Sequence, residues 1–392
     1  MSKFIEIHVL QEVGVNASNC DELGSPKTLT NGPKDTRYRF SSQSITRSVK
    51  DLIENMYKGE QIMDSSSRLH HSLLAKILKT EHGFSDEDAT ILAEDVYKKI
   101  FEGEKEKERK KRKDSSEKKD GKKVKEKKSV VALISKYEIE FVASEIKTVY
   151  DSLSEGENDI ESVVKKIKIK DSFFQGGIKA SLFGRMFASK PTMNVAATVQ
   201  RSHMCTTHKV DIAANIDSFT AMDELLERET GAGHMDEKMF SCGCFYKCWV
   251  ISLDELKDEN HLGNIIKINP DFDSNKFLRM VIKEICRALP KGKTNSFFNS
   301  STPSFVLLNV VDDSLPLSYE TTFAVPVKRD DQCAQQSINK LLERYEKNRQ
   351  WVNYSFSGVW VNSGYVVNKS EQSFINEFNI IDELIKKVVE LS

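Results

Sequence analysis

Hydrophobic and polar positions along the chain predict a mixture of strands and helices. Apolar residues alternate with polar ones over 3–10, where Ile5, Ile7 and Val9 would share one face of a strand. Over 42–57 they recur at helical spacing instead, and Ser41 or Ser42 is a typical helix cap. The remaining pattern predicts strands at 177–189, 239–252 and 304–311, and a helix over 276–289 that is capped by Ser274 or Asn275 and ended by Pro290.

The order of these elements predicts an α+β fold. Strand, helix, strand, strand, helix, strand (βαββαβ) is the ferredoxin-like order that RNA-recognition domains also use. Two long connections interrupt it, because helical segments precede the second strand and about fifty mixed residues separate the middle strands. The inserted helices are predicted near 67–80, 86–102, 129–152 and 159–170, and further helices near 330–347 and 371–390 flank an aromatic segment at 351–360.

Length and charge bound the possibilities further. A chain of 392 residues with 39% hydrophobic residues can form one elaborated domain or two to three lobes. The net charge is −1, yet residues 104–128 hold fourteen Lys or Arg and seven Asp or Glu, so the charge is segregated. This tract is predicted to be disordered. No apolar run is long enough to cross a bilayer and no signal peptide is recognisable, so a soluble, cytoplasmic protein is expected.

The cysteines could suggest a metal site. Cys242, Cys244 and Cys248 are close together, and His234 lies upstream. However, their spacing lacks the paired knuckles of structural zinc, and the aromatic and apolar residues around them predict a strand. Buried free thiols are therefore expected, with no metal and no cofactor.

The segment 34–50 predicts a phosphate-binding site. Arg37 and Arg39 alternate with aromatic residues, so an extended backbone would place both guanidiniums on one face. A helix start follows, whose free N–H groups and positive dipole end favour anions, and Arg47 and Lys50 fall on the solvent side of that helix. The alternative is an ordinary capped helix beside an edge strand.

Several ordered motifs together resemble the CasC family, the repeated backbone subunit of the type I-E CRISPR surveillance complex Cascade. The motifs are Phe4-Ile-Glu-Ile-His-Val-Leu10, Arg37-Tyr-Arg-Phe-Ser-Ser-Gln-Ser44, Phe183-Gly-Arg-Met186, His203 through His208-Lys-Val-Asp211, Asp217-Ser-Phe-Thr-Ala-Met-Asp223, Gly231-Ala-Gly-His234 with Phe240-Ser and Phe245-Tyr246, and Pro316-Leu-Ser318. The resemblance is weak over 60–170 and over the C-terminal quarter.

The resemblance implies a hand-shaped subunit. Its ferredoxin-like or RNA-recognition-like palm would comprise 1–59, a strand within 173–189, and 239–392 with the C-terminal helices. The helical fingers would be 60–172, including the Lys-rich 103–128, and the thumb 190–238. Copies would polymerise along one CRISPR RNA without membrane contact, grip its backbone, and displace bases at regular intervals so that the guide pairs with target DNA. The other implied partners are the large, small, guide 5′-end and guide-processing subunits of Cascade.

The resemblance also implies which residues bind the guide. Met186 and Met235 would flank the displaced base, whereas Thr46 stands where many relatives have a basic residue. The alternatives are a sheet-core role for Met186 and satisfied polar packing for His203, His208 and His234. The complete set of expected RNA-binding residues is Lys27, Arg37, Arg39, Ser42, Gln43, Arg47, Lys50, Arg185, Met186, His208 and Met235.

Two other classes of protein stay open. Backbone subunits of type III complexes cleave RNA with an acidic residue after the first strand, and Asp21 and Asp35 lie in the equivalent loop here. The order of the motifs favours the type I-E form, so no enzymatic activity is expected. A stand-alone RNA-binding protein with the palm fold is the other alternative. The Lys-rich tract would be either a solvated linker or a sequence-independent contact to target DNA or a neighbour.

Overall fold

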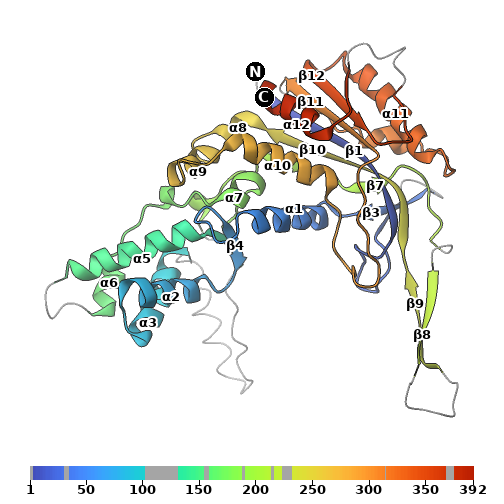
Figure 1. The fold of residues 1–392 in the computed structure, drawn as a ribbon. Helices are drawn as coiled ribbons and strands as arrows, with labels where there is room; N and C mark the ends of the chain where they lie inside the picture. The colour runs from blue at the N-terminus through green and yellow to red at the C-terminus, as the bar shows by residue number, and fades with distance from the viewer. Residues whose placement is uncertain are drawn as a thin grey trace. The chain divides into compact units, whose positions relative to one another are not determined.

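The computed structural model describes residues 3–30, 35–101, 131–153, 159–187, 190–212, 216–222, 232–313, 315–367 and 375–392. The Lys-rich tract at 103–128 lies outside the described residues. The chain divides into two compact units. Unit 1 comprises Met1–Asn55, Val199–Asp254 and Asp273–Ser392, and unit 2 comprises Met56–Thr198 and Glu255–Phe272. Both units combine helices and strands, which confirms the α+β class (Figure 1).

Unit 1 is built on a mixed sheet of nine strands. The strand order is β13-β12-β11-β1-β10-β7-β3-β2, and β6 also pairs with β10. Neighbours are antiparallel, apart from the parallel pair β12 and β13. The strands are β1 (Lys3–Asn16), β2 (Thr28–Thr30), β3 (Thr36–Phe40), β6 (Val199–Arg201), β7 (Met204–Thr206), β10 (Ser241–Ser252), β11 (Phe305–Asp312), β12 (Tyr354–Val361) and β13 (Asn376–Phe378).

The alternation in β1 places different side chains on the two faces of this sheet. Ile5, Ile7 and Val9 are fully buried on one face, where α10 (Ser274–Arg287) and α12 (Ile381–Leu391) pack. Leu10 lies on the other face in an apolar cluster with α11 (Cys333–Asn348). Burial on both faces agrees with a central strand, and the predicted strand at 3–10 is confirmed, with an extension to Asn16.

Unit 2 is mainly helical. Its core is formed by apolar stripes of the helices, including Leu74, Leu92 and Val142. The helices predicted near 67–80 and 86–102 are confirmed, and the one near 159–170 is confirmed over 160–166. The segment 129–152 begins with a short strand in its described part. The elements are β4 (Asp64–Ser67), α2 (His70–His82), α3 (Asp86–Phe101), β5 (Ala132–Ser135), α5 (Lys136–Asp151), α6 (Ile160–Lys166), α7 (Ile178–Phe183) and α9 (Leu262–Ile268), with 3₁₀ turns at Asp171–Phe173 and Pro191–Met193.

The strand predicted at 177–189 is wrong, because residues 178–183 form the helix α7. The Asp64 carboxylate accepts hydrogen bonds from the backbone N–H groups of Gly177 (2.5 Å) and Ala180 (2.9 Å), which satisfies amides at the start of that helix. Asp64 lies more than a hundred residues away in the sequence, so local patterning could not reveal this cap. The partners of β10 on this side are β6 and β7 instead.

Other boundaries differ in smaller ways. The cap of α10 is Asp273, whose carboxylate accepts from the Lys276 N–H (2.8 Å), rather than Ser274 or Asn275. The helix predicted at 371–390 begins only at Ile381, after β13; residues 371–374 lie outside the described part. The remaining elements are α8 (Leu253–Lys257), the 3₁₀ turn Glu320–Ala324, and the two-stranded pair β8 (Ile216–Met222) and β9 (Ala232–Met239). None of the helices in the described ranges is long and apolar enough to span a membrane.

Candidate nucleic-acid interface

The start of α1 (Ser42–Met56) is held in place by its surroundings in unit 1. The side chains of Tyr38 and Phe40 in β3 and of Ile45 and Val49 in α1 are buried in the core. The junction between β3 and α1 is therefore fixed on both sides. Ser41 caps the helix, since its Oγ accepts from the Ser44 N–H (3.3 Å). The predicted helix and its serine cap are thereby confirmed. The positive end of the α1 dipole points out of this junction.

Two polar side chains from other segments complete the helix start. The Asn19 Oδ1 accepts from the Ser41 N–H (2.9 Å), and the His203 Nδ1 accepts from the Ser42 N–H (3.0 Å). Burial and the nearby Arg39 lower the pKa of His203. The ring is therefore neutral at pH 7, with its proton on Nε2, and His203 is exposed. It can offer an N–H donor to a ligand beside the helix start.

Two basic residues lie next to this helix start. The Lys27 carbonyl accepts from the Arg39 N–H (2.9 Å), which places Lys27 beside Arg39 just before β2 begins. Both residues are half-buried. Within the described ranges neither side chain has a carboxylate partner at ion-pair distance, so both retain their positive charge for a ligand.

Farther along α1, the side chains point to solvent as predicted for Gln43 and Arg47. Gln43 is exposed, and the Arg47 side chain is 75% exposed, with an ion pair to Asp51 at 2.8 Å. An exposed pair one helical turn apart contributes little and exchanges easily for a phosphate. Lys50 is half-buried, and Thr46 is buried with its hydroxyl bonded to the Ser42 carbonyl. This part of α1 can therefore offer Gln43 and Arg47 to a backbone.

Arg37 does not share this role. It is 4% exposed, and its Nε and Nη2 donate to the two carboxylate oxygens of Asp35 (2.6 and 3.0 Å). Its remaining described bonds go to the carbonyls of Thr206 (2.9 Å) and Phe323 (2.8 Å). The hydrogen bond from Arg37 lowers the pKa of Asp35, so the pair is ionised. The prediction that Arg37 and Arg39 act together on phosphate does not fit this geometry, because partners distant in the sequence occupy Arg37.

The surroundings of Arg37 include a cavity of about 250 Å³. Its walls are Leu29, Arg37, Cys205, Thr206, Tyr246, Glu320, Thr321, Phe323 and Ala324. Burial raises the pKa of Glu320 and brings that of Cys205 to about 12, so the thiol is protonated. The cavity is therefore mainly apolar, and the Arg37 charge inside it is compensated by Asp35.

His208 is also a structural residue. It is 1% exposed, its Nδ1 bonds the Lys209 carbonyl (2.8 Å), and its Nε2 accepts from the Cys244 N–H (3.3 Å). Burial is the main cause that lowers its pKa. Gly243 has φ +141°, and a Cβ there would lie 2.3 Å from the His208 Nε2. The structure thus favours satisfied polar packing over the predicted RNA contact.

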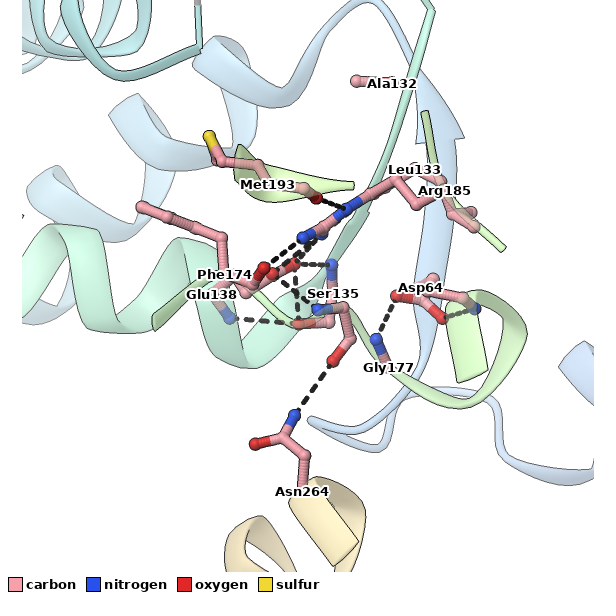
Figure 2. Close-up of polar contacts among 12 residues, drawn as sticks. Asp64, Ala132, Leu133, Ser135, Glu138, Phe174, Gly177, Arg185, Met193 and Asn264 are labelled. Atoms are coloured by element: carbon pink, nitrogen blue, oxygen red, sulfur yellow. Dashed lines mark hydrogen bonds and ion pairs between the residues drawn. The ribbon is translucent and has the colours of Figure 1, made fainter. Parts of the chain in front are cut away.

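Arg185 is the centre of a buried polar cluster in unit 2 (Figure 2). It is 5% exposed, and its Nη1 lies 2.8 and 3.1 Å from the Glu138 carboxylate oxygens. Its other donors reach the carbonyls of Met193 (3.2 Å) and Phe174 (2.5 Å). Arg185 therefore holds the segments around α5 and α7 together, and the expected guide contact does not fit its burial.

The two methionines differ in what the structure describes. Met186 is 79% exposed, so the alternative of a core position is wrong. Met235 lies in β9, where its backbone pairs with Thr220; its side chain lies outside the described part. Neither observation tests a contact with a displaced base.

The expectation of buried free thiols is confirmed for two of the three clustered cysteines. Cys244 and Cys248 are buried free thiols in β10, and Cys242 is a half-buried free thiol. Among the described residues, no group of three or more His, Cys, Asp or Glu has an arrangement suited to a metal ion.

Two residues of this interface were not expected to contribute. Asn19 was part of an irregular loop, and only the structure shows that its side chain caps the α1 start. His203 was expected to make satisfied polar packing. Its Nδ1 does bond the Ser42 N–H, but the residue is exposed and its Nε2–H can reach a ligand. The clustering of Asn, Ser and Gly before 41 was the available signal, since such residues often bond a helix terminus.

Comparisons with known proteins agree with this fold. A chain from a "CRISPR RNA-guided surveillance complex, pre-nicking" shares 22% identity at a TM-score of 0.71, over 99% of each chain. A chain from a "CRISPR RNA-guided surveillance complex" shares 20% identity at a TM-score of 0.65, over 99% of this chain and 100% of that one. At these identities the similarity establishes a shared fold.

The model of the CT1975-like protein family matches residues 5–387, and the chain belongs to that family. This match confirms the family relationship that the CasC-like motifs predicted. A search of curated proteins finds no match.

Proposed function

We propose that this chain is a backbone subunit of a type I-E CRISPR surveillance complex, and that it polymerises along CRISPR RNA. It would use a ferredoxin-like palm to grip the guide backbone, and it would displace bases at regular intervals so that the rest can pair with target DNA. The other subunits of such a complex would be its protein partners. The observation that carries this proposal is the α1 start, where His203 binds the Ser42 N–H and the preceding Arg39 pairs through its backbone with Lys27.

The chemistry of this site suits a ligand of any sequence. Arginine and lysine side chains and a neutral imidazole N–H bind phosphate oxygens, which are identical at every nucleotide. An assembly that reads its target by base pairing needs such contacts, because the base edges must stay free for the complementary strand. The exposed Arg47 would add a phosphate contact one turn along the same helix.

The proposal includes no nuclease activity. The two carboxylates considered for catalysis already have partners: Asp35 binds Arg37 through both oxygens, and the Asp21 Oδ1 accepts from the N–H groups of Leu23 (2.9 Å) and Ser25 (3.0 Å). Magnesium-dependent cleavage of a bound complementary RNA by the purified chain would contradict this part of the proposal.

The test combines binding with assembly. The double variant Lys27→Gln/Arg39→Gln should bind RNA more weakly, and its log affinity should depend less on log salt by roughly 1.4, or about 0.7 for each lost contact to a single strand. Lys386→Gln/Lys387→Gln is the matched control, since both lysines are exposed on α12. Scrambling the spacer at constant length should change wild-type affinity by no more than a few-fold.

Size-exclusion chromatography separates the alternatives. Guide RNA should convert the wild-type chain into particles whose mass grows with RNA length, which a stand-alone RNA-binding protein would not do. A Lys27→Gln/Arg39→Gln variant with wild-type affinity and wild-type salt dependence would refute the proposed grip.

A further inference from the structure

The loop that connects α10 to β11, residues 290–303, combines exposed charge with an exposed aromatic ring. Lys291 and Lys293 are both exposed. Phe298 is 83% exposed, so its ring is open to a ligand. A basic segment with a solvent-facing ring is the combination that proteins use to hold single-stranded nucleic acid.

Buried groups anchor both ends of this loop. Lys247 in β10 is fully buried and donates to the carbonyl of Ala288 (2.8 Å) and to the Gln11 Oε1 (3.2 Å). The Gln11 Nε2 in turn donates to the Ser301 carbonyl (2.7 Å), and the Ser301 Oγ donates to the Glu12 carbonyl (2.7 Å). Burial lowers the pKa of Lys247 to about 7, so this anchor is costly in free energy. The ends of the loop are therefore held by hydrogen bonds to β10 and β1.

The backbone of the loop is also constrained. Lys293 has φ 49°, the one positive φ of a non-glycine residue in the described ranges. At Gly292 a Cβ would lie 2.3 Å from the Ser18 carbonyl oxygen, so only glycine permits this close approach. A Cβ at Gly24 would lie 3.7 Å from the Lys293 Nζ. The loop therefore packs against residues 18–24, with the Lys293 amine beside them.

This contact connects the loop to the α1 start. The Asn19 carbonyl accepts from the Lys27 N–H (3.0 Å), and the Asn19 side chain caps Ser41, so one short segment touches both regions. The segment also carries two carboxylates. Asp21 uses an oxygen for two backbone N–H groups, and Glu22 is exposed. Glu12, which bonds Ser301 and Ser304 at the end of the loop, adds a third carboxylate. The four basic residues Lys291, Lys293, Lys27 and Arg39 outnumber these three carboxylates.

We propose that the 290–303 loop is a second contact for single-stranded nucleic acid, in which Lys291 and Lys293 bind phosphates and Phe298 stacks on a base. The proposal rests on the proposed function, because it extends the same polyanion surface beyond the α1 start. A base face is present on every nucleotide, so stacking on Phe298 would preserve the indifference to sequence. The strand could be the guide RNA or a DNA strand.

Separate variants test the two kinds of contact. Lys291→Gln/Lys293→Asn removes both charges, and Asn tolerates the positive φ at 293. This variant should flatten the salt dependence of wild-type binding by roughly 1.4 in the slope of log affinity against log salt. Phe298→Ala should weaken binding roughly five- to a hundredfold and leave the salt slope unchanged, because stacking releases no counterions.

A matched control removes the same chemistry elsewhere in unit 1. Lys386→Gln/Lys387→Gln removes two exposed charges, and Trp351→Ala removes a side chain that is 81% exposed. The control should match wild type in affinity and slope. All variants are compared by thermal unfolding first, and only variants that melt within a few degrees of wild type are used in the binding assays.

The arms use labelled single-stranded RNA, labelled single-stranded DNA, and guide-assembled particles that capture complementary DNA. A loss with RNA alone assigns the loop to the guide, and a loss only when DNA is added assigns it to a DNA strand. Loop variants that match the control in every arm would overturn the inference. If the Lys27→Gln/Arg39→Gln variant bound RNA as tightly as wild type, the proposed grip at the α1 start would be refuted. The result for the 290–303 loop would still stand on its own.

Discussion

Replacing Arg185 by methionine should destabilise unit 2 and leave RNA binding by the folded chain unchanged. The guanidinium is buried against the Glu138 carboxylate at 2.8 Å, and it is the one described cation at that carboxylate. Methionine approximates the apolar length of the side chain but donates no hydrogen bond. Glu138 would keep only the N–H and hydroxyl of Ser135 and the N–H of Gly176.

The expected magnitude follows from the burial of both partners. Removing one member of a buried ion pair typically costs about 3–5 kcal/mol, since the remaining charge is uncompensated. For a unit of this size each kcal/mol shifts the melting temperature by about 2–4 °C, so a decrease of roughly 6–20 °C is expected. Replacing both partners, as Arg185→Met/Glu138→Gln, should recover part of this loss because no charge is left unpaired.

Thermal unfolding and hydrogen exchange measure the effect. Exchange should accelerate in the segments that the cluster joins, around 133–139 and 174–187. Binding to single-stranded RNA, measured well below the melting temperature, should keep the wild-type salt slope. A variant with wild-type unfolding but a slope reduced by about 0.7 would show instead that Arg185 contacts a phosphate, as the sequence motif suggested.

Three further predictions use other parts of the molecule. Burial raises the pKa of Asp64 to about 6, so the folded state binds this proton more tightly than the unfolded state. The free energy of unfolding should therefore fall by about 3 kcal/mol as the pH rises from about 4 to above 6. Denaturant titrations of Asp64→Asn should show a flatter pH profile. Gly243→Ala should destabilise unit 1 by more than about 2 kcal/mol, and His208→Ala in the same chain should relieve part of the clash, as measured by thermal unfolding. Met186→Ala/Met235→Ala should blunt a periodic base-reactivity pattern in assembled guide RNA with little loss of affinity; an unchanged pattern in the folded variant would refute the base-displacement role.

Local signals explain why α1 and β1 could be predicted. A serine cap followed by buried residues at helical spacing specifies α1 without reference to the rest of the chain. The alternation in β1 specifies its two faces in the same way, since Ile5 and Ile7 face one layer and Glu6 the other. For both elements, the local sequence alone defines which face is buried.

The fate of the arginines could not be predicted in this way. Alternation places Arg37 and Arg39 on the same side of β3, and it says nothing about the carbonyls of Thr206 and Phe323 that receive the Arg37 donors. Similarly, the apolar pattern at 177–189 permits a strand, and α7 forms because Asp64 binds its first amides. In each case a partner far along the chain decides between local alternatives.

Buried carboxylate partners therefore separate the arginines that support the fold from those that bind RNA in our proposal, since the Asp51 partner of Arg47 is solvent-accessible. Asp35 and Glu138 are buried beside Arg37 and Arg185, and each pair satisfies its own charges inside the protein. The bond from Arg37 lowers the pKa of Asp35, so this compensation persists at any pH suited to RNA binding. A phosphate at the edge of unit 1 would then be attracted by Arg39, whereas the charge of Arg37 is cancelled by Asp35. Asp35 thus neutralises Arg37 inside unit 1, where the remaining Arg37 donors bind the carbonyls of Thr206 and Phe323, and Arg39 is left as the arginine of β3 that can bind a phosphate.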